Sequence, residues 1–280
     1  MPQIISHHLP LHEHLATLRG QGQSIGFVPT MGALHAGHIA LVNQAKAQCD
    51  VVVVSIFVNP KQFGQNEDFG RYPRPIEADL ALLEQAQADI AYLPTAETMY
   101  PTGFSSLIHV SGISEGLCGA ARPGHFDGVA TVVCKLLLQT LAHRAYFGEK
   151  DYQQLQLIRR LVEDLNIPVD IIACATVREA DGLALSSRNQ YLSSTERATA
   201  PLLYATLQQT ATRIKEGRTV EETLIFGRNQ LEEGGFDRVD YLELRHAHTL
   251  VPMSAYTAPA RLLVAAHLGR TRLIDNVAVE

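Results

Sequence analysis

The sequence has 280 residues, of which 46% are hydrophobic and 19% are charged, and its formal net charge is -6 at pH 7. This composition is typical of an ordinary globular protein, and the acidic balance argues against nucleic-acid binding, which needs clustered Lys and Arg. The longest strongly apolar stretch, residues 51–58, is far shorter than the roughly 20 residues that span a bilayer, so we expect no membrane role.

The N-terminus indicates a cytoplasmic protein, and the spacing of the cysteines is typical of thiols in the core. Residues 1–10 lack the basic and apolar segments of a secretory signal. Cys49, Cys118, Cys134 and Cys174 show no C-x-x-C spacing, which argues against a disulfide framework and a structural zinc site. We therefore expect a cytoplasmic location and four thiols in the core.

Apolar, β-rich segments alternate with helical patterns through about the first 175 residues. Strands are predicted at residues 24–29, 51–58, 90–94, 145–149 and 169–174. Helices are predicted at residues 38–47, 76–88, 129–141 and 152–165. Because such alternation places helices on both faces of parallel strands, we expect an α/β fold with a Rossmann-like, doubly wound parallel sheet.

The pattern changes after Val177. A polar loop and two long helical runs follow, at residues 178–193, 195–216 and 220–233. Three more strands are predicted at residues 239–244, 261–268 and 273–279. Because strands and helices segregate here, we expect a smaller C-terminal α+β domain, with the boundary between residues 1–176 and residues 177–280.

The stretch PTMGALHAGH, residues 29–38, stands where the first of these predicted strands gives way to a helix. Gly32 and Gly37 permit a tight turn and a close approach of the backbone to a ligand. The free N–H groups and the positive dipole end of the helix favour an anion. His35 and His38 are three residues apart, so both imidazoles can face one phosphate group. An isolated H-x-x-H is more often a pair of capping or surface histidines.

Polar residues also follow two other predicted strands, and loops at the carboxyl ends of parallel strands converge on one crevice. Asn59 and Gln62 follow the second strand and suit a small polar substrate. Lys150 stands at a helix start, followed by Asp151 and Gln154, and is a suitable phosphate anchor. Taken singly, each of these residues is more often turn chemistry or a solvated side chain.

Two further segments carry cationic groups. Arg122 and His125 belong to ARPGHF and by themselves assign no role. The stretch ADGLALSSRNQYL offers the hydroxyls of Ser186 and Ser187 and the guanidinium of Arg188, whose fork suits phosphate oxygens. Such a polar loop is typical either of a lid over a site or of an interdomain linker.

Eight ordered stretches resemble the pantoate-β-alanine ligase family, in the superfamily of nucleotidylyltransferases and class I aminoacyl-tRNA synthetases. They are PTMGALHAGH, SIFVNPKQFG, YPR, RPGHF, FGEKDYQQL, TVREADGLALSSRNQYL, VDYLELR and TRLIDN. In this resemblance, HAGH corresponds to the HIGH signature of the superfamily and LSSRN to its flexible second signature. Leu185 stands where many relatives have Met, an exchange that preserves apolar bulk.

The resemblance implies an ATP-dependent ligase that joins (R)-pantoate and β-alanine into pantothenate, in the coenzyme A pathway. ATP would be cleaved to AMP and pyrophosphate through a pantoyl-adenylate intermediate. Mg²⁺ would be carried on the triphosphate oxygens, with no metal-ligating residue assigned. The resemblance also implies a homodimer and a C-terminal domain that covers the reaction as a lid.

The resemblance assigns roles to particular residues. His38 would be the proton donor, with His35 as a phosphate contact beside it, and Lys150 and Arg188 would stabilise the triphosphate in the transition state together with Ser186 and Ser187. Pantoate and β-alanine would contact Asn59, Gln62 and Gln154. ATP would contact Met31, Gly32, Ala33, Leu34, His35, Ala36, Gly37, His38, Gly148, Glu149, Lys150, Asp151, Val177, Leu185, Ser186, Ser187 and Arg188.

Three alternatives remain open from the sequence. Another nucleotidylyltransferase of the superfamily, acting on a small acid or phosphate, would share HAGH but stop at a nucleotidylated product. A nicotinamide-dependent dehydrogenase needs G-x-G-x-x-G after a strand, whereas the glycines at residues 20–26 precede one. A noncatalytic binding module would show no turnover. The cluster His7, His8, His12 and His14 could bind a metal but has no cysteine or carboxylate framework.

Overall fold

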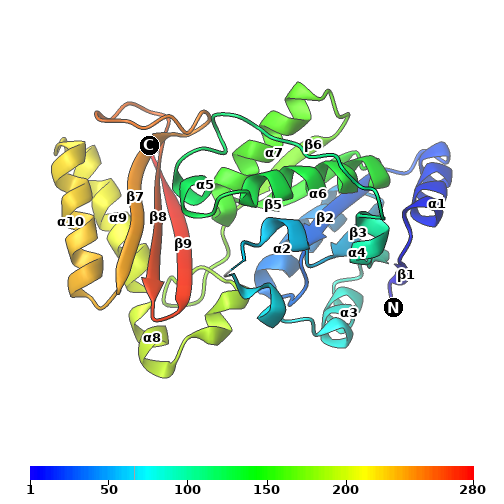
Figure 1. The fold of residues 1–280 in the computed structure, drawn as a ribbon, viewed down its shortest axis with the longest axis horizontal. Helices are drawn as coiled ribbons and strands as arrows, with labels where there is room; N and C mark the ends of the chain where they lie inside the picture. Colours follow the sequence, from blue (N-terminus) through cyan, green and yellow to red (C-terminus); the bar gives the residue numbers. More distant parts are fainter. Residues whose placement is uncertain (66) are drawn as a thin grey trace. The chain divides into compact units, whose positions relative to one another are not determined.

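The computed structural model describes residues 1–65 and 67–280, and the chain divides into two compact units. The first unit comprises Met1–Ser114, Arg122–Glu149 and Leu157–Ala175. The second unit comprises Glu115–Ala121, Lys150–Gln156 and Thr176–Glu280. Each unit has its own sheet, six-stranded in the first and three-stranded in the second (Figure 1). The functional domains 1–176 and 177–280 stay a prediction.

The sheet of the first unit is parallel throughout, with the strand order β1-β4-β3-β2-β5-β6. Its strands are β1 (Gln3–Ile5), β2 (Ile25–Thr30), β3 (Val51–Ile56), β4 (Ile90–Tyr92), β5 (Arg144–Gly148) and β6 (Asp170–Cys174). All residues of β3 are buried, as expected of a central parallel strand covered on both faces. The predicted doubly wound parallel sheet is confirmed.

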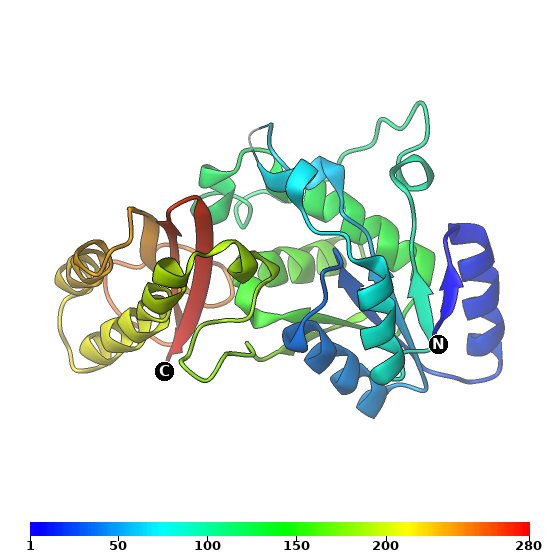
Figure 2. The ribbon, with the colours of Figure 1, turned by 90° about the horizontal axis from the view of Figure 1, so that it is seen from below.

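Helices cover both faces of this sheet because right-handed crossovers place them on one face where the chain winds one way across the sheet and on the other face where it winds back. The helices α2 (Ala36–Gln48) and α3 (Ile76–Gln85) lie on one face, and α1 (His8–Gly20) and α6 (His125–Thr140) lie on the other (Figure 2). The chain runs outward from β2 to β3 and β4, and then returns to β5 on the other side of β2. The carboxyl end of β2 is therefore the switch point at which open α/β sheets bind ligands.

Shorter elements complete the first unit. They are α4 (Ala96–Met99) and the 3-10 helices η1 (Pro60–Gln62) and η2 (Asp68–Arg71). In chain order, η3 (Glu149–Asp151) and α7 (Tyr152–Asp164) follow β5. Residues 150–156 of these two helices belong to the second unit, and their other residues belong to the first. A core of buried side chains that includes Val28, Val54, Val42 and Leu83 packs the sheet against α2 and α3. This packing fixes the ends of β2 and β3, from which the candidate site is built.

The second unit is an antiparallel sheet covered by two helices. Its strands β7 (Arg238–His246), β8 (Ala260–Leu268) and β9 (Thr271–Val279) pair in that order. The helices α9 (Leu202–Lys215) and α10 (Val220–Glu233) pack against it around buried residues such as Leu207, Leu231 and Leu262. The shorter elements are α5 (Leu117–Ala121), η4 (Ser187–Tyr191) and α8 (Ser194–Thr199). The predicted C-terminal α+β organisation is confirmed.

The prediction of one continuous helix at residues 195–216 is wrong, because the structure has two helices there. The helix α8 ends at Thr199, and α9 begins at Leu202. Pro201 separates them, because proline has no N–H for the helical hydrogen bond and its ring clashes with the preceding turn. Apolar residues recur with helical periodicity on both sides of this proline. Periodicity alone therefore predicts one continuous helix.

The N-terminal ends of the first unit's helices also differ from the prediction. The helix α2 begins at Ala36 and α6 begins at His125, both earlier than predicted. Neither β1 nor α1 was predicted, because β1 has only 3 residues and α1 buries only Leu11 and Leu15. Both elements carry too little apolar pattern to be detected from the sequence.

The cysteines and the lengths of the helices bear on two further predictions. All four cysteines are free and buried, which confirms the predicted core thiols. Among the described residues, no helix has the length and apolar character needed to cross a membrane.

Candidate functional site

The segment after β2 makes a tight turn before α2 begins. Gly32 has φ +79° and Ala33 has φ +50°, so two successive residues adopt the left-handed backbone region. A Cβ atom on Gly32 would lie 2.9 Å from Asp79 Oδ2 and 3.0 Å from Ile56 Cγ2. Only glycine therefore fits here, and the turn sets where the N-terminus of α2 begins.

The carboxylate of Asp79 holds this turn from α3. Its Oδ2 accepts a hydrogen bond from the N–H of Ala33 at 2.9 Å, and its Oδ1 accepts one from the N–H of Leu34 at 2.7 Å. Asp79 is 1% exposed, and burial raises the pKa of its carboxyl against the opposing effect of the two hydrogen bonds. The sequence reasoning missed this residue. Asp79 lies four residues before buried Leu83, so both residues are on the same face of α3. An acidic residue on an apolar helix face could have been identified from the sequence as a candidate buried carboxylate.

His35 and His38 both cap α2 through their Nδ1 atoms. The Nδ1 of His35 accepts a hydrogen bond from the N–H of Gly37 at 3.1 Å, and the Nδ1 of His38 accepts one from the N–H of His35 at 3.3 Å. The two ring centroids are 4.1 Å apart. A neutral imidazole that accepts at Nδ1 carries its proton on Nε2, so Nε2 is the donor side of each ring. Capping and phosphate binding are therefore compatible roles for this pair.

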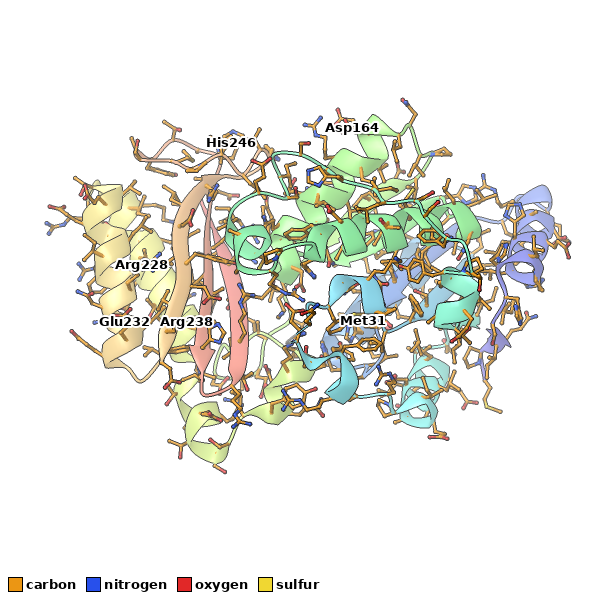
Figure 3. The ribbon with its side chains drawn as sticks, in the orientation of Figure 1. Met31, Asp164, Arg228, Glu232, Arg238 and His246 are labelled. Atoms are coloured by element: carbon orange, nitrogen blue, oxygen red, sulfur yellow. The ribbon has the colours of Figure 1, made fainter. Side chains whose placement is uncertain are left out.

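Asn59 and Gln62 are buried where η1 follows β3. The Nδ2 of Asn59 donates to Gln62 Oε1 at 3.0 Å and to the carbonyl of Gly128 at 3.1 Å. The hydroxyl of Tyr100 donates to Asn59 Oδ1 at 2.7 Å, and burial raises the pKa of this phenol, which keeps it a donor. Gln62 Nε2 lies 3.0 Å from the sulfur of Met31, labelled in Figure 3, which links these amides to the segment after β2.

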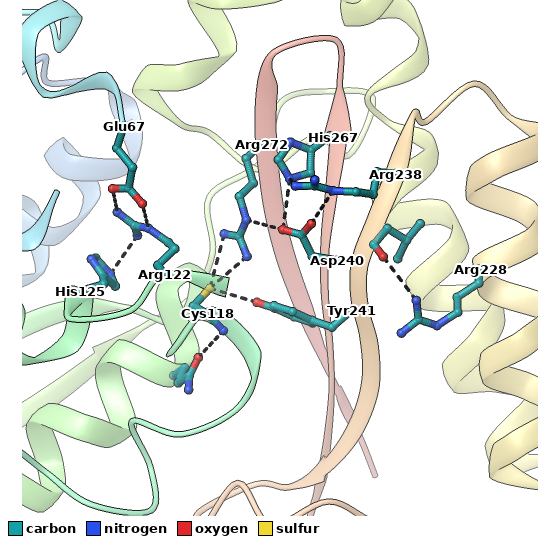
Figure 4. A network of polar contacts seen from close by, with 12 residues as sticks. Glu67, Cys118, Arg122, His125, Arg228, Arg238, Asp240, Tyr241, His267 and Arg272 are labelled. Carbon is teal, nitrogen blue, oxygen red and sulfur yellow. Dashed lines mark hydrogen bonds and ion pairs between the residues drawn. The ribbon is translucent and has the colours of Figure 1, made fainter. Parts of the chain in front are cut away.

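Arg122 and His125, whose roles were open from the sequence, support the backbone of Gln62. Both oxygens of Glu67 accept hydrogen bonds from Arg122 at 2.6 Å, and Arg122 Nη1 lies 2.9 Å from His125 Nε2 (Figure 4). His125 Nδ1 lies 2.9 Å from the carbonyl oxygen of Gln62. Because a guanidinium only donates and a carbonyl only accepts, neutral His125 accepts at Nε2 and donates at Nδ1. Burial raises the pKa of Glu67, but Arg122 outweighs this effect and holds the pKa below its usual value.

In the second unit, Lys150 lies in η3, directly before α7. Its ammonium nitrogen lies 3.8 Å from a carboxylate oxygen of Asp151, and its side chain is mostly buried. Gln154 is half-buried in the first turn of α7. The mostly buried side chain of Lys150 carries a positive charge, which makes this a suitable place for phosphate oxygens.

Ser186 directly precedes η4, and Ser187 and Arg188 are the first two residues of this short helix. The N–H of Leu185 donates to the carbonyl of Val177 at 3.0 Å, which brings together two residues predicted to contact ATP. The hydroxyl of Ser186 caps η4 by accepting a hydrogen bond from the N–H of Arg188 at 3.3 Å. Backbone hydrogen bonds and a helix cap therefore give this segment a defined local conformation.

The predicted site residues fall into two groups. Residues 31–38, 59, 62, 148 and 149 belong to the first unit, and residues 150, 151, 154, 177 and 185–188 belong to the second. The structure brings Met31, Asn59 and Gln62 together directly. The catalytic and ATP-binding assignments stay predictions, as does the gripping of one nucleotide by both groups. Within residues 1–65 and 67–280, no cluster of three or more His, Cys, Asp or Glu could hold a metal ion, and this includes the N-terminal histidines.

Comparison with known sequences gives full-length matches. A family model described as pantoate-beta-alanine ligase matches residues 3–278. A pantothenate synthetase from a Chelativorans species is 55% identical over 269 residues, covering 96% of this chain and 95% of the relative. A pantothenate synthetase from Cereibacter sphaeroides is 51% identical over 279 residues, covering 100% of both chains.

Solved structures give the same match for the fold. The crystal structure of pantothenate synthetase from Thermus thermophilus has a TM-score of 0.93 and 48% identity, with 99% of each chain covered. The pantoate-beta-alanine ligase of Francisella tularensis, crystallised with beta-gamma ATP and beta-alanine, has a TM-score of 0.84 and 38% identity, with 99% of this chain and 98% of that chain covered.

Proposed function

Because this chain belongs to the pantoate-beta-alanine ligase family, we propose that it joins (R)-pantoate and β-alanine into pantothenate and cleaves ATP to AMP and pyrophosphate. The observation that carries this proposal is the family match over residues 3–278. The Francisella tularensis relative, which was crystallised with beta-gamma ATP and beta-alanine, supports ATP and β-alanine as ligands.

A carboxylate is a poor acylating agent, so forming an amide from pantoate needs an activation step. The pantoate carboxylate attacks the α-phosphorus of ATP, the bond from that phosphorus to the bridging oxygen breaks, and pyrophosphate leaves pantoyl adenylate behind. The amine of β-alanine then attacks the acyl carbon, AMP departs, and the nitrogen loses a proton. No residue needs to form a covalent bond, so the protein acts by aligning the reactants and stabilising charge.

In this proposal, the first unit supplies the imidazoles, the start of α2 and the buried amides. His38 donates from Nε2 to the departing phosphate oxygens, with His35 beside it, because both Nδ1 atoms accept backbone hydrogen bonds. Residues 31–38 together with Gly148 and Glu149 contact ATP. Gln62 binds pantoate and β-alanine. Asn59 contributes to the same substrate site and also orients the Gln62 side chain.

The second unit supplies the other charged groups. Lys150 and Arg188 stabilise the triphosphate as charge builds on it, with the hydroxyls of Ser186 and Ser187. Asp151, Val177 and Leu185 contact the rest of the nucleotide, and Gln154 contacts pantoate. We propose that residues 177–280 act as the lid domain, because an acyl adenylate must be kept from water.

Magnesium would be bound by the triphosphate and not by a protein cage. Mg²⁺ prefers six oxygen ligands in octahedral geometry. The carboxylate of Asp79 is already engaged by two backbone N–H groups, and the described residues contain no cluster of three acidic or histidine side chains suited to a metal. When bound, Mg²⁺ neutralises charge on the phosphate oxygens, and we assign it no step of its own.

The family resemblance also leads us to propose a homodimer in the cytoplasm, where ATP is supplied. Light scattering should then give a mass of twice the 30.7 kDa of one chain. A mass of 30.7 kDa at all concentrations would contradict the dimer without affecting the proposed reaction.

The reaction is tested by supplying the purified chain with ATP, pantoate and β-alanine, separately and together. We expect pyrophosphate with ATP and pantoate alone, and AMP and pantothenate in equal amounts when β-alanine is added. A nucleotidylated product that accumulates whether or not β-alanine is present would favour the superfamily's nucleotidylyltransferases. A single stoichiometric burst of pyrophosphate without turnover would indicate a binding protein.

A further inference from the structure

We propose that Asp275 and Asn276 are positioning residues that hold two phosphate-binding segments of the second unit at a fixed separation. The segments are Lys150 and residues 185–188, so the inference rests on the proposed function. Both residues belong to TRLIDN, the C-terminal motif to which the reaction above assigns no role. The two residues are adjacent on β9, and each is 3% exposed.

Asp275 holds the segment that leads to Ser186 and Arg188. Its two oxygens accept hydrogen bonds from Arg178 Nη1 at 2.6 Å and from Nη2 at 2.9 Å, a bidentate pair. Arg178 also donates to the carbonyl of Gly182 at 3.0 Å. Arg178 lies beside Val177 in the turn that pairs with Leu185, so Asp275 fixes the base of this segment.

The guanidinium of Arg178 is held on a second side. It lies over the ring of Tyr204 on α9, 3.6 Å from the ring centroid. A guanidinium that is stacked and bidentately bound has little rotational freedom, so the position of Asp275 is transmitted to the turn.

Asn276 holds the segment that carries Lys150. Its Nδ2 donates to the backbone carbonyl of Lys150 at 2.9 Å, and its Oδ1 accepts from Arg261 Nε at 2.6 Å. Arg261 lies over the ring of Tyr152, 4.1 Å from the ring centroid. Tyr152 is the residue that directly follows η3. The backbone of Lys150 is thereby tied to β9, which fixes the point from which its side chain starts.

The adjacent positions act on opposite faces of the sheet because successive side chains in a strand alternate. Leu273 and Val279 are in the core beneath α9 and α10, so Asp275 faces that side and Asn276 faces the other. The strand β9 pairs with β8 along its whole length, which makes it a stiff spacer. One dipeptide thus sets the separation between an ammonium and a hydroxyl-rich loop, and a shift of about 1 Å in such a group can cost about 100-fold in rate.

The test compares Asn276→Asp and Asp275→Asn with Asp240→Asn as a matched control. Asn276→Asp keeps the acceptor for Arg261 but removes the donor to Lys150, and Asp275→Asn removes one of the two oxygens that bind Arg178. Asp240→Asn breaks a comparable pair with Arg272 at 2.8 Å in the same sheet (Figure 4), where it contacts neither segment. We expect the first two variants to release pyrophosphate about tenfold more slowly or worse, and the control to keep the rate of the unsubstituted chain.

A merely structural role is separated by repeating the substitutions in backgrounds that lack the positioned group. Asn276→Asp should slow Lys150→Ala by less than about twofold, and Asp275→Asn should slow a variant in which Ser186, Ser187 and Arg188 are all replaced by Ala by less than about twofold. The same fold-loss in both backgrounds would overturn the inference, as would full activity of both single variants. If Asp275→Asn does not fold, Arg178→Lys tests the same bidentate contact. Absence of pantothenate formation by the unsubstituted chain would instead refute the proposed function.

Discussion

The two nitrogens of the His38 ring have different tasks in this structure. Nδ1 accepts the N–H of His35 at 3.3 Å, which leaves the proton of the neutral ring on Nε2. We expect His38→Ala to lower the rate of pyrophosphate release by about 100-fold or more, the size of typical acid-base and charge-stabilising contributions. Exposed His8 on α1 provides the control, since His8→Ala should keep the full rate. Unaltered pyrophosphate release by His38→Ala would remove this imidazole from the reaction.

Asp79, on α3, holds the turn between β2 and α2 that leads to His35 and His38. Replacing it with Asn converts one of the oxygens that accept from Ala33 and Leu34 into a donor, so one backbone N–H loses its partner. Because burial raises the pKa of this carboxyl, the loss of its charge should partly offset the loss of stability. We expect Asp79→Asn to stay folded but to show an ATP KM about tenfold higher, from misplacement of the turn. Glu77→Gln, at an exposed position of α3, should match the unsubstituted chain, and an unchanged ATP KM in Asp79→Asn would contradict the role of the turn.

At the scale of elements, α6 approaches η1 so closely that Gly128 admits no side chain. A Cβ atom at Gly128 would lie 2.2 Å from the backbone oxygen of Lys61 and 2.7 Å from Gln62 Cα. Gly128→Ala should therefore push η1 away and displace Gln62. We expect a pantoate KM about tenfold higher, together with about 1–3 kcal/mol of lost stability from overpacking. Gly20→Ala, where a Cβ meets nothing within 4 Å, is the control. Lower stability with an unchanged pantoate KM would contradict the coupling.

The elements also explain what could be read from the sequence. The strand β3 and the helix α7 carry long apolar patterns, so both were predicted close to their observed bounds. The His35 and His38 pair was found because its spacing and its position after a strand are local features. The contacts of Asp79, Tyr100 and Asp275 join residues 41–97 positions apart, and such contacts leave no periodic signal in one sequence. Local pattern therefore predicted the elements, whereas the supports of the site required the fold.

At the scale of the whole molecule, each unit contains a carboxyl group whose pKa lies below its usual value. Burial raises the pKa of Glu67 and of Asp240. Arg122 outweighs that effect for Glu67 in the first unit, and Arg272 together with His267 outweighs it for Asp240 in the second. A carboxyl whose pKa is lower in the folded than in the unfolded chain stabilises the fold above the unfolded pKa. That contribution is lost as the pH falls through the folded pKa. Acidification should therefore lower the free energy of unfolding of both units.

We expect the thermal unfolding midpoint to fall as the pH drops below about 4.5, near the pKa of an unfolded glutamate. Glu67→Gln should lower the midpoint at pH 7 by about 2–4 °C for each 1 kcal/mol lost, and should then lose less on acidification because the group that titrates is gone. Glu163→Gln provides the control, since Glu163 is 72% exposed in its pair with Arg160 and should contribute little. Calorimetry from about pH 8 to about pH 3.5 at constant ionic strength measures all three chains. If the curve of Glu67→Gln runs parallel to that of the unsubstituted chain, the Arg122 contact does not stabilise the first unit through this carboxylate.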